Sequence, residues 1–326
     1  MGNEHLNIDE RENILKMRAE HKSMRQIGEH LGRDAGTISR ELRRNISSTG
    51  EYKPHLAQRY SEKRREQSKQ PYRLEEDAWL CGYVRNRLKQ YWSPEQISST
   101  LKKKYAKVIS FVTIYSWVYR DIACGGGFYK FLRLSHRWRS RRRAGVDRRG
   151  QMPDRRMIDK RPGIVNQRKR IGDWESDTLE GQKSCGLLAT HVERKSRYTV
   201  AVKVKDKSAG TVTRATVRAM KKLPNEKVKT MTFDNGKEFA GFKELERGLG
   251  MRSYFANPYH SWERGTNENT NGLLRQFFPK GTNFALVGKA EVDRAVKLLN
   301  NRPRKCLNYR TPAEVFWGKP MCCASG

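Results

Sequence analysis

Apolar residues recur at helical spacing through the first part of the chain. Two triplets share the spacing i, i+3, i+7, namely Met24, Ile27 and Leu31, and then Ala35, Ile38 and Leu42. This spacing gives each segment one apolar face, so residues 6–45 are predicted to form three short helices. Ser23 with Gln26 makes a capping box, Gly32 is a typical helix end, and Asp34 can cap the next helix.

The last two of these helices, joined by a tight turn, predict a helix-turn-helix. Thr37, Arg40 and Arg43 point away from the apolar stripe and, together with Arg44, are the candidate DNA contacts. The alternative is a solvated basic helix in a small helical bundle of any function. Periodicity alone does not separate the two.

A second helical unit is predicted from about residue 73 to residue 122. Its clearest signal is Ser93-Pro94-Glu95-Gln96, which combines an N-cap, a first-turn proline and a capping-box glutamine. Ile97 and Leu101 supply the apolar face of that helix. Ile114, Trp117 and Val118 do the same for the last helix, which Ser110 opens, and a second helix-turn-helix fits.

Lys and Arg dominate the stretch between this unit and the rest of the chain. Residues 133–170 contain few apolar side chains, and only Asp147, Asp154 and Asp159 oppose the positive charge. Such a segment buries too little apolar surface to fold alone. We expect a basic linker that orders, if at all, along a phosphate backbone.

The pattern changes to strands after residue 170. Residues 187–192 and 198–204 have compositions typical of strands, the second with alternating valines, and 228–233 fits a buried strand. Helices are predicted between and after these strands, at 208–222, 237–248, 263–278, 288–300 and 311–317. This alternation indicates an α/β domain with a mixed sheet.

The composition reduces the number of possible functions. The formal net charge is +33, from 68 Lys and Arg against 35 Asp and Glu, and both halves of the chain carry the excess. This excludes an ordinary metabolic enzyme and favours a nucleic-acid partner. The six cysteines show no zinc-site spacing, so we expect reduced thiols. Without a signal peptide or a membrane-spanning run, we expect a cytoplasmic, nucleoid-associated protein with no membrane partner.

Three carboxylates stand in distinctive local sequences. Asp177 lies in GDWESDTLEG, Asp234 in TMTFDNGKEF, and Glu268 in GTNENTNGLLRQ. Mg²⁺ prefers oxygen ligands, and two such ions held about 3.5–4 Å apart can clamp the attacking and leaving oxygens at phosphorus. The acids therefore point to phosphoryl transfer on DNA.

Periodicity leaves one choice open among the acids. Asp173, Glu175 and Asp177 alternate, so on a strand all three face the same side, and spacing does not identify the ligand. Arg275 follows Glu268 by about two helical turns and falls on nearly the same face, where it can hold a phosphate.

Long ordered motifs carry a family resemblance from about residue 5 to residue 318. They are GRDAGTISRELRRN, DWESDTLEG, TFDNGKEF, NPYHSWERGTNENTNGLLRQFFPKGTNF and LNNRPRKCLNYRTPAEVF. In these motifs the chain resembles the IS-thirty (IS30) family of bacterial insertion-sequence transposases, whose catalytic domain has the RNase H-like integrase fold. The resemblance implies Asp177, Asp234 and Glu268 as the catalytic, metal-binding triad. The family usually has His and Gly where this chain has Asp173 and Ser176.

The resemblance implies a multidomain protein. Its parts are a helix-turn-helix at 1–48, a charged linker or helix at 49–72, a second helix-turn-helix at 73–122, a basic linker at 123–170, an α/β RNase H-like catalytic domain at 171–318 and a tail at 319–326.

The implied activity is that of a DDE transposase. It binds the terminal inverted repeats of the element and, with two Mg²⁺ ions for which Mn²⁺ can substitute, cleaves a DNA strand and joins it to target DNA. Because two DNA ends are held together, a homodimer or higher oligomer is expected. The rival interpretations are a DNA-binding repressor with an inert catalytic fold and a structural nucleoid protein.

Overall fold

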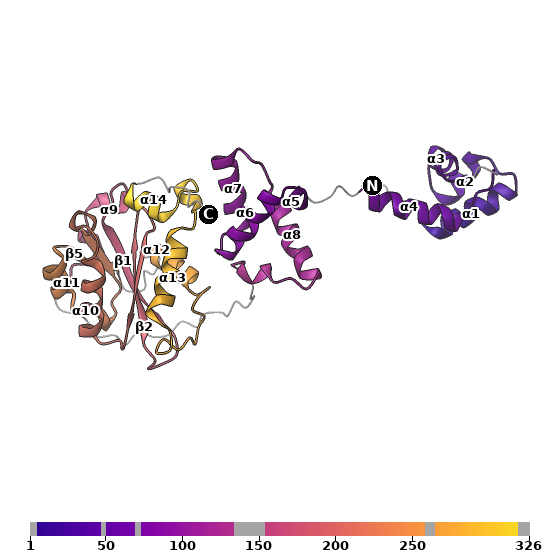
Figure 1. Cartoon of the computed structure of the whole chain (residues 1–326). Coiled ribbons are helices and arrows are strands. Elements are labelled where there is room, and N and C mark those ends of the chain that lie inside the picture. Colours follow the sequence, from indigo (N-terminus) through magenta and orange to yellow (C-terminus); the bar gives the residue numbers. More distant parts are fainter. Residues whose placement is uncertain (1–4, 47–49, 69–72, 134–153, 258–264, 319–326) are drawn as a thin grey trace. The chain divides into compact units, whose positions relative to one another are not determined.

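The computed structural model describes most of the chain. The described residues are 5–46, 50–68, 73–133, 154–257 and 265–318. Contacts divide the chain into two units, residues 1–76 and residues 77–326, which Figure 1 shows in the colours of the sequence. Four of the six cysteines lie in the described part, and these four are free thiols.

The first unit is helical, as its apolar spacing predicts. Ile14, Ile27, Ile38 and Leu42 are buried in its core. The elements are α1 (Ile8–Ala19), α2 (Met24–Leu31), α3 (Ala35–Asn45), α4 (Pro54–Ser68) and the single turn α5 (Arg73–Glu76). Residues 54–68, assigned from sequence to a charged linker or helix, thus form a helix, and it packs on α1 and α3.

Local hydrogen bonds set the turn between α2 and α3. Ser23 and Gln26 form the predicted capping box, and Asp34 accepts a hydrogen bond from the Gly36 N–H at the start of α3. Gly32 ends α2 in the left-handed conformation, with φ of 63°. The helix-turn-helix geometry therefore follows from signals within a few residues.

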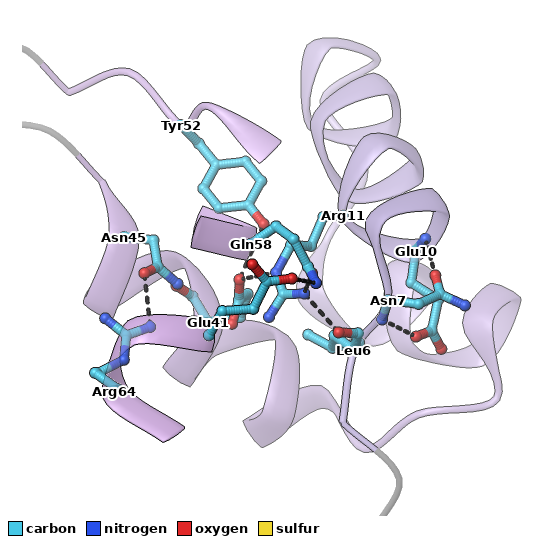
Figure 2. Close-up of polar contacts among 10 residues, drawn as sticks. Leu6, Asn7, Glu10, Arg11, Glu41, Asn45, Tyr52, Gln58 and Arg64 are labelled. Atoms are coloured by element: carbon cyan, nitrogen blue, oxygen red, sulfur yellow. Dashed lines mark hydrogen bonds and ion pairs between the residues drawn. The ribbon is translucent and has the colours of Figure 1, made fainter. Parts of the chain in front are cut away.

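A buried ion pair crosses the first unit. The Arg11 Nε of α1 donates to the Glu41 Oε1 of α3 over 2.7 Å, and the Tyr52 hydroxyl donates to the same oxygen over 3.2 Å. Arg11 also reaches the Leu6 carbonyl and the Gln58 side chain of α4 (Figure 2). One guanidinium thereby connects α1, α3 and α4.

Loss of Glu41 should destabilise this unit. In Glu41→Ala the buried Arg11 loses its counter-charge, which typically costs about 3–5 kcal/mol. Hydrogen exchange of α1 and α3 amides, followed by mass spectrometry, should show protection reduced accordingly. The matched control is Glu51→Ala, which removes one partner of the exposed Lys53–Glu51 pair; equal loss of protection in both variants would contradict the role of the buried pair.

The second unit begins with the predicted second helical region. Its elements are α6 (Ala78–Lys89), α7 (Pro94–Tyr105), α8 (Phe111–Ala123) and the 3₁₀ turn η1 (Phe128–Phe131). Ser93 and Gln96 form the predicted capping box, and Trp117 is part of the core. The Gln96 Nε2 also donates to the Pro303 carbonyl over 2.7 Å, so α7 contacts the C-terminal part of the unit.

A five-stranded mixed sheet forms the centre of the α/β domain. The strands are β1 (Asp173–Glu180), β2 (Leu187–Glu193), β3 (Thr199–Val204), β4 (Thr230–Phe233) and β5 (Arg252–Phe255), in the order β3-β2-β1-β4-β5. β1, β2 and β3 are antiparallel neighbours, whereas β1–β4 and β4–β5 are parallel. The sequence prediction of a mixed sheet is confirmed, but it omitted β5.

Helices cover both faces of the sheet (Figure 1). On one face α10 (Ala209–Met220) and α11 (Phe242–Leu249) enclose an apolar core around Trp174 and Phe233, which α14 (Pro312–Trp317) extends with Phe316. On the other face α12 (Gly265–Leu274) and α13 (Lys289–Asn300) pack on Leu179 and Leu188. The sheet is thus buried between two layers.

The basic linker is partly ordered by the α/β domain. Residues 134–153 lie outside the described residues, but η2 (Ile158–Lys160) and α9 (Gly163–Gln167) follow. Ile158 and Val165 are buried, and the Arg161 guanidinium donates to the Thr232 hydroxyl over 2.9 Å. The expectation that this stretch orders only along DNA is therefore wrong for its C-terminal part, because two apolar side chains and a buried arginine anchor it to the protein.

A buried histidine makes the stability of the α/β domain sensitive to pH. His191 of β2 is inaccessible to solvent; its Nδ1 lies 2.8 Å from the Ser176 hydroxyl, and its Nε2 has no hydrogen-bond partner among the described residues. Burial lowers the pKa of His191 to about 4. The neutral imidazole is therefore the form compatible with the fold.

Acidification should weaken the fold in a defined window. Between the unfolded pKa near 6.5 and the folded value near 4, the unfolded chain binds the proton more tightly. Stability should fall as the pH drops through this window, by about 3 kcal/mol. Urea unfolding followed by tryptophan fluorescence at several pH values tests this, with His191→Gln as the non-titrating control; an identical pH dependence in both proteins would refute the assignment.

Candidate active site

The pairing of β1 with β4 brings two of the predicted acids side by side. In this parallel ladder Asp173 lies opposite Thr230 and Glu175 opposite Thr232, an offset of 57 residues. Continuing the same offset places Asp177 opposite Asp234, at the carboxyl end of β4. Adjacent strands are about 4.8 Å apart, so the two carboxylates project from neighbouring positions at one edge of the sheet.

An open cleft of about 640 Å³ lies at this edge. It is lined by Asp177, Thr178, Glu180, Lys207, Asp234, Gly236, Lys237 and Glu238. The cleft thus contains oxygen donors of the type that hard divalent cations prefer.

Neighbouring donors orient the Asp177 carboxylate. The Thr178 N–H donates to its Oδ1 over 2.8 Å, and the Asn271 Nδ2 of α12 donates to its Oδ2 over 3.2 Å. Asn267, one turn earlier on α12, donates to the carbonyl oxygens of Glu175 and Thr190. Two asparagines therefore anchor α12 across β1 and β2.

A short turn orients Asp234. Its Oδ1 accepts a hydrogen bond from the Gly236 N–H over 3.0 Å, which closes a turn at Asn235-Gly236. The Asn235 side chain donates to the Ala256 carbonyl over 2.9 Å and accepts from Arg155 over 2.7 Å. A Cβ on Gly236 would lie 2.4 Å from the Glu238 carboxylate, so glycine fits this turn.

Glu268 is exposed in the first turn of α12 and does not line the cleft. Asn271, which contacts Asp177, follows Glu268 by three residues and so lies on the same side of the helix, about 4.5 Å along its axis. Among the described residues, no three His, Cys, Asp or Glu side chains form a group that could hold a metal ion. Asp177 and Asp234 therefore share a cleft, and the complete triad stays a prediction.

Arg275 lies at the end of β1. Its guanidinium donates to the Glu180 carbonyl over 2.7 Å, and Glu180 lines the cleft. The predicted phosphate-binding role of Arg275 stays a prediction.

Asp173 and Glu175, the two acids that alternate with Asp177 on β1, are structural. Asp173 pairs with Arg170 at 2.9 Å and accepts a hydrogen bond from the Thr230 hydroxyl. Glu175 pairs with Arg194 at 3.1 Å and accepts from the Asn267 N–H. Both are buried, and neither lines the cleft. Asp173 is thus engaged away from the cleft.

Sequence reasoning missed further charged residues of the cleft, among them Lys207 and Glu238. The Lys207 ammonium lies 2.6 Å from the Glu180 carboxylate and 3.2 Å from that of Glu238, which also accepts from the Thr178 hydroxyl. Burial opposes protonation of Lys207, but these two acids outweigh it and raise its pKa. Lys207 therefore brings a positive charge into an acidic cleft. Glu238 was visible within the TFDNGKEF motif, whereas no local signal marked Lys207.

The candidate DNA contacts lie on α3. Arg40, Arg43 and Arg44 are exposed and Thr37 is half-buried, so the helix presents a basic face. The Arg40 Nε donates to the Gly36 carbonyl over 2.9 Å, which holds its guanidinium along the helix.

Comparison with known proteins agrees with both parts of this architecture. The helix-turn-helix domain family matches residues 3–45, and the integrase core domain family matches residues 167–261, which include Asp177 and Asp234. The transposase for insertion sequence element IS1086 of Cupriavidus metallidurans is 38% identical over 95% of this chain and 94% of its own length. The chain belongs to the IS30 family of insertion-sequence transposases.

Further members of the IS30 family match over similar lengths. The transposase for IS4351 of Bacteroides fragilis is 39% identical over 96% of this chain and 95% of its own. Transposase InsI for IS30A of Escherichia coli is 37% identical over 96% of this chain and 83% of its own. The chain is therefore an insertion-sequence transposase with an integrase core, a class whose chemistry uses divalent metal ions.

Solved structures are also similar to part of this chain. The catalytic core domain of BIV integrase aligns at 20% identity and a TM-score of 0.38, over 46% of this chain and 95% of that one. None of the helices in the described ranges is long and apolar enough to span a membrane.

Proposed function

We propose that this IS30-family transposase binds the terminal inverted repeats of its element and catalyses metal-dependent DNA cleavage and strand transfer. The observation that carries the proposal is the juxtaposition of Asp177 and Asp234. They extend from neighbouring parallel strands into one open cleft, in a chain with a net charge of +33. A binding protein without catalytic activity has no need of paired carboxylates at such a position.

Asp177, Asp234 and Glu268 would hold two Mg²⁺ ions, for which Mn²⁺ can substitute. The donor set fits, because carboxylate oxygens are the preferred ligands of both ions. Asn271 and the Thr178 N–H already fix the direction of the Asp177 carboxylate. Glu268 is exposed on the same side of α12 as Asn271, which contacts Asp177. When bound, the ions supply Lewis acidity to the attacking and leaving oxygens at phosphorus.

Positive side chains would position the DNA. Arg275 lies beside Glu180 at the margin of the cleft, where its guanidinium suits a backbone phosphate. On α3, Thr37 with Arg40, Arg43 and Arg44 would contact the terminal repeat. Because two element ends take part in each transposition, the active form would be a homodimer or higher oligomer.

Removal of the third carboxylate should separate binding from catalysis. Glu268→Gln keeps the shape of the side chain but loses a negative charge, so DNA affinity in a gel shift should be retained. Cleavage of labelled element ends in Mg²⁺ should fall on the order of 10³-fold, or about 4 kcal/mol of transition-state stabilisation. Chelation of the metal with EDTA should abolish cleavage by the unchanged protein.

Two further variants make this test specific. Glu291→Gln changes an exposed glutamate on α13 and should leave cleavage unchanged. Glu238→Gln alters the other glutamate of the cleft. If Glu268→Gln is active and Glu238→Gln is inactive, the third ligand is Glu238 and our assignment is wrong.

Loss of an exposed arginine on α3 should weaken DNA binding. Arg40→Ala removes a guanidinium from the proposed DNA-contacting face, and a base-contacting arginine is worth about 1–3 kcal/mol, so affinity for the element ends should drop roughly tenfold or more. Filter-binding titration at fixed salt measures this. Arg18→Ala, on the exposed surface of α1, has the same change in charge and serves as the control; equal affinities of the two variants would place the recognition surface elsewhere.

A further inference from the structure

The outer edge of β3 borders an apolar groove. β3 is the last strand on its side of the sheet, and α10 and α13 pack against it from the two faces. The space between these helices amounts to about 1010 Å³ and runs along the whole strand, from Tyr198 to Lys205. Its walls include Val202, Ala219 and Val296.

Alternate residues of β3 turn their backbone N–H and C=O groups into this groove, where none of the described strands pairs with them. In an antiparallel pair, the N–H and C=O of alternate residues face the neighbouring strand, and those of the residues between face away. Tyr198 faces β2, since its carbonyl accepts from the Glu193 N–H over 2.8 Å. Thr199 must then face outward, and so must Ala201 and Lys203.

A side chain of the protein already pairs with Thr199, the first of these outward-facing residues. The Asn300 side chain donates to the Thr199 carbonyl over 2.8 Å and accepts from the Thr199 N–H over 2.8 Å. Its amide thus pairs with Thr199 as the backbone of another strand would. Ala201 and Lys203 present the same pair of groups further along the groove, where the described sheet has no further strand.

The groove fits one added strand with apolar side chains on both faces. Val200 and Val202 belong to the core on the α10 side, whereas Ala201 packs against the core on the α13 side. The small side chains of Ala215 and Ala219 leave room on α10. An inserted strand would therefore meet apolar walls with every residue, and not with alternate ones only.

The rim of the groove is positive. Lys205, Arg218 and Lys222 are exposed along it, whereas the acidic Asp293 is already paired with Lys289. A second copy of this chain would bring an equally basic rim into contact, which charge repulsion opposes. DNA suits the rim but not the apolar walls. An extended peptide with acidic flanks would complement the positive rim, pack on the apolar walls and form hydrogen bonds with the outward backbone groups of β3.

We propose that the β3 edge is a binding groove for an extended, apolar segment of another protein with acidic residues beside it. The segment adds a strand to the sheet through hydrogen bonds with the backbones of Ala201 and Lys203. Lys205, Arg218 and Lys222 select its acidic flanks. The groove is separate from the acidic cleft, because none of the residues that line one also lines the other.

A labelled peptide tests the proposal on the full chain. The probe is a short valine- and isoleucine-rich peptide with acidic residues at both ends, and fluorescence anisotropy measures its binding. A second peptide has the same flanks but prolines in its centre, so it retains the charge and cannot pair as a strand. The first peptide should bind saturably and at least about tenfold more tightly than the second.

Variants of the protein locate the binding site. Ala201→Pro removes an outward N–H without removing a bond to β2, so the protein should fold normally and bind the peptide about tenfold more weakly. Ala201→Ser keeps the N–H and should bind normally. The double variant Arg218→Glu/Lys222→Glu should also lose affinity, whereas Arg214→Glu/Lys221→Glu, with the same change in charge outside the groove, should not.

Three results would overturn the proposal. Equal binding of both peptides would show general attraction to a basic protein. A wild-type dimer in sedimentation that Ala201→Pro converts to a monomer would assign the edge to a second copy of the chain. Displacement of the peptide by DNA, with DNA affinity unaffected in Ala201→Pro and reduced in Arg218→Glu/Lys222→Glu, would make the rim a DNA-binding surface.

Discussion

The parallel pairing of β1 with β4 is the constraint on which the catalytic part of this transposase depends. Asp177 and Asp234 are distant in the sequence, and only a ladder with an offset of 57 residues makes them neighbours. A slip of one residue would turn the β1 acids to the opposite face of the sheet. The apolar core around Trp174 and Phe233 prevents this slip, because the side chains between the acids are buried on the other face.

Neighbouring carboxylates repel one another, and the cleft contains a positive charge and neutral hydrogen-bond donors that offset this repulsion. The Lys207 ammonium pairs with Glu180 and Glu238, while neutral donors from Asn271 and Thr178 reach Asp177. These contacts lower the cost of repulsion among the acids when no cation is near. They also restrict the Asp177 carboxylate before any ligand arrives, which is the usual requirement of a preorganised site.

In the helix-turn-helix unit, an ion pair helps to hold the helix that carries the candidate DNA contacts. α3 must present arginines to solvent on one face and pack on α2 and α4 with the other, and it has few apolar residues for this purpose. Glu41 on the packed face pairs with the buried Arg11, which also reaches α4. In a chain rich in positive charge, a buried acid thus fixes the orientation of the helix whose exposed face is basic.

Local signals in the sequence were sufficient for most helices. The capping boxes at Ser23 and Ser93 and the apolar spacing in the first 120 residues involve only neighbours within one or two turns, so they are legible without a structure. The motifs around Asp177, Asp234 and Glu268 likewise identified the family. β5 was not predicted because it is four residues long and has no alternating pattern. The ordered structure of residues 158–167 was not predicted because only two buried apolar residues, Ile158 and Val165, anchor it.

Only the tertiary structure showed how the three alternating acids of β1 differ in their contacts and which other residues accompany Asp177 in the cleft. Asp173, Glu175 and Asp177 are equivalent by alternation, and their different roles come from Arg170, Arg194 and Asn271, which reach them from other segments. The position of Lys207 in the cleft and the edge position of β3 in the sheet were likewise visible only in the tertiary structure. Strand register and side-chain contacts between distant segments are non-local, and the spacing of residues along one chain does not contain them.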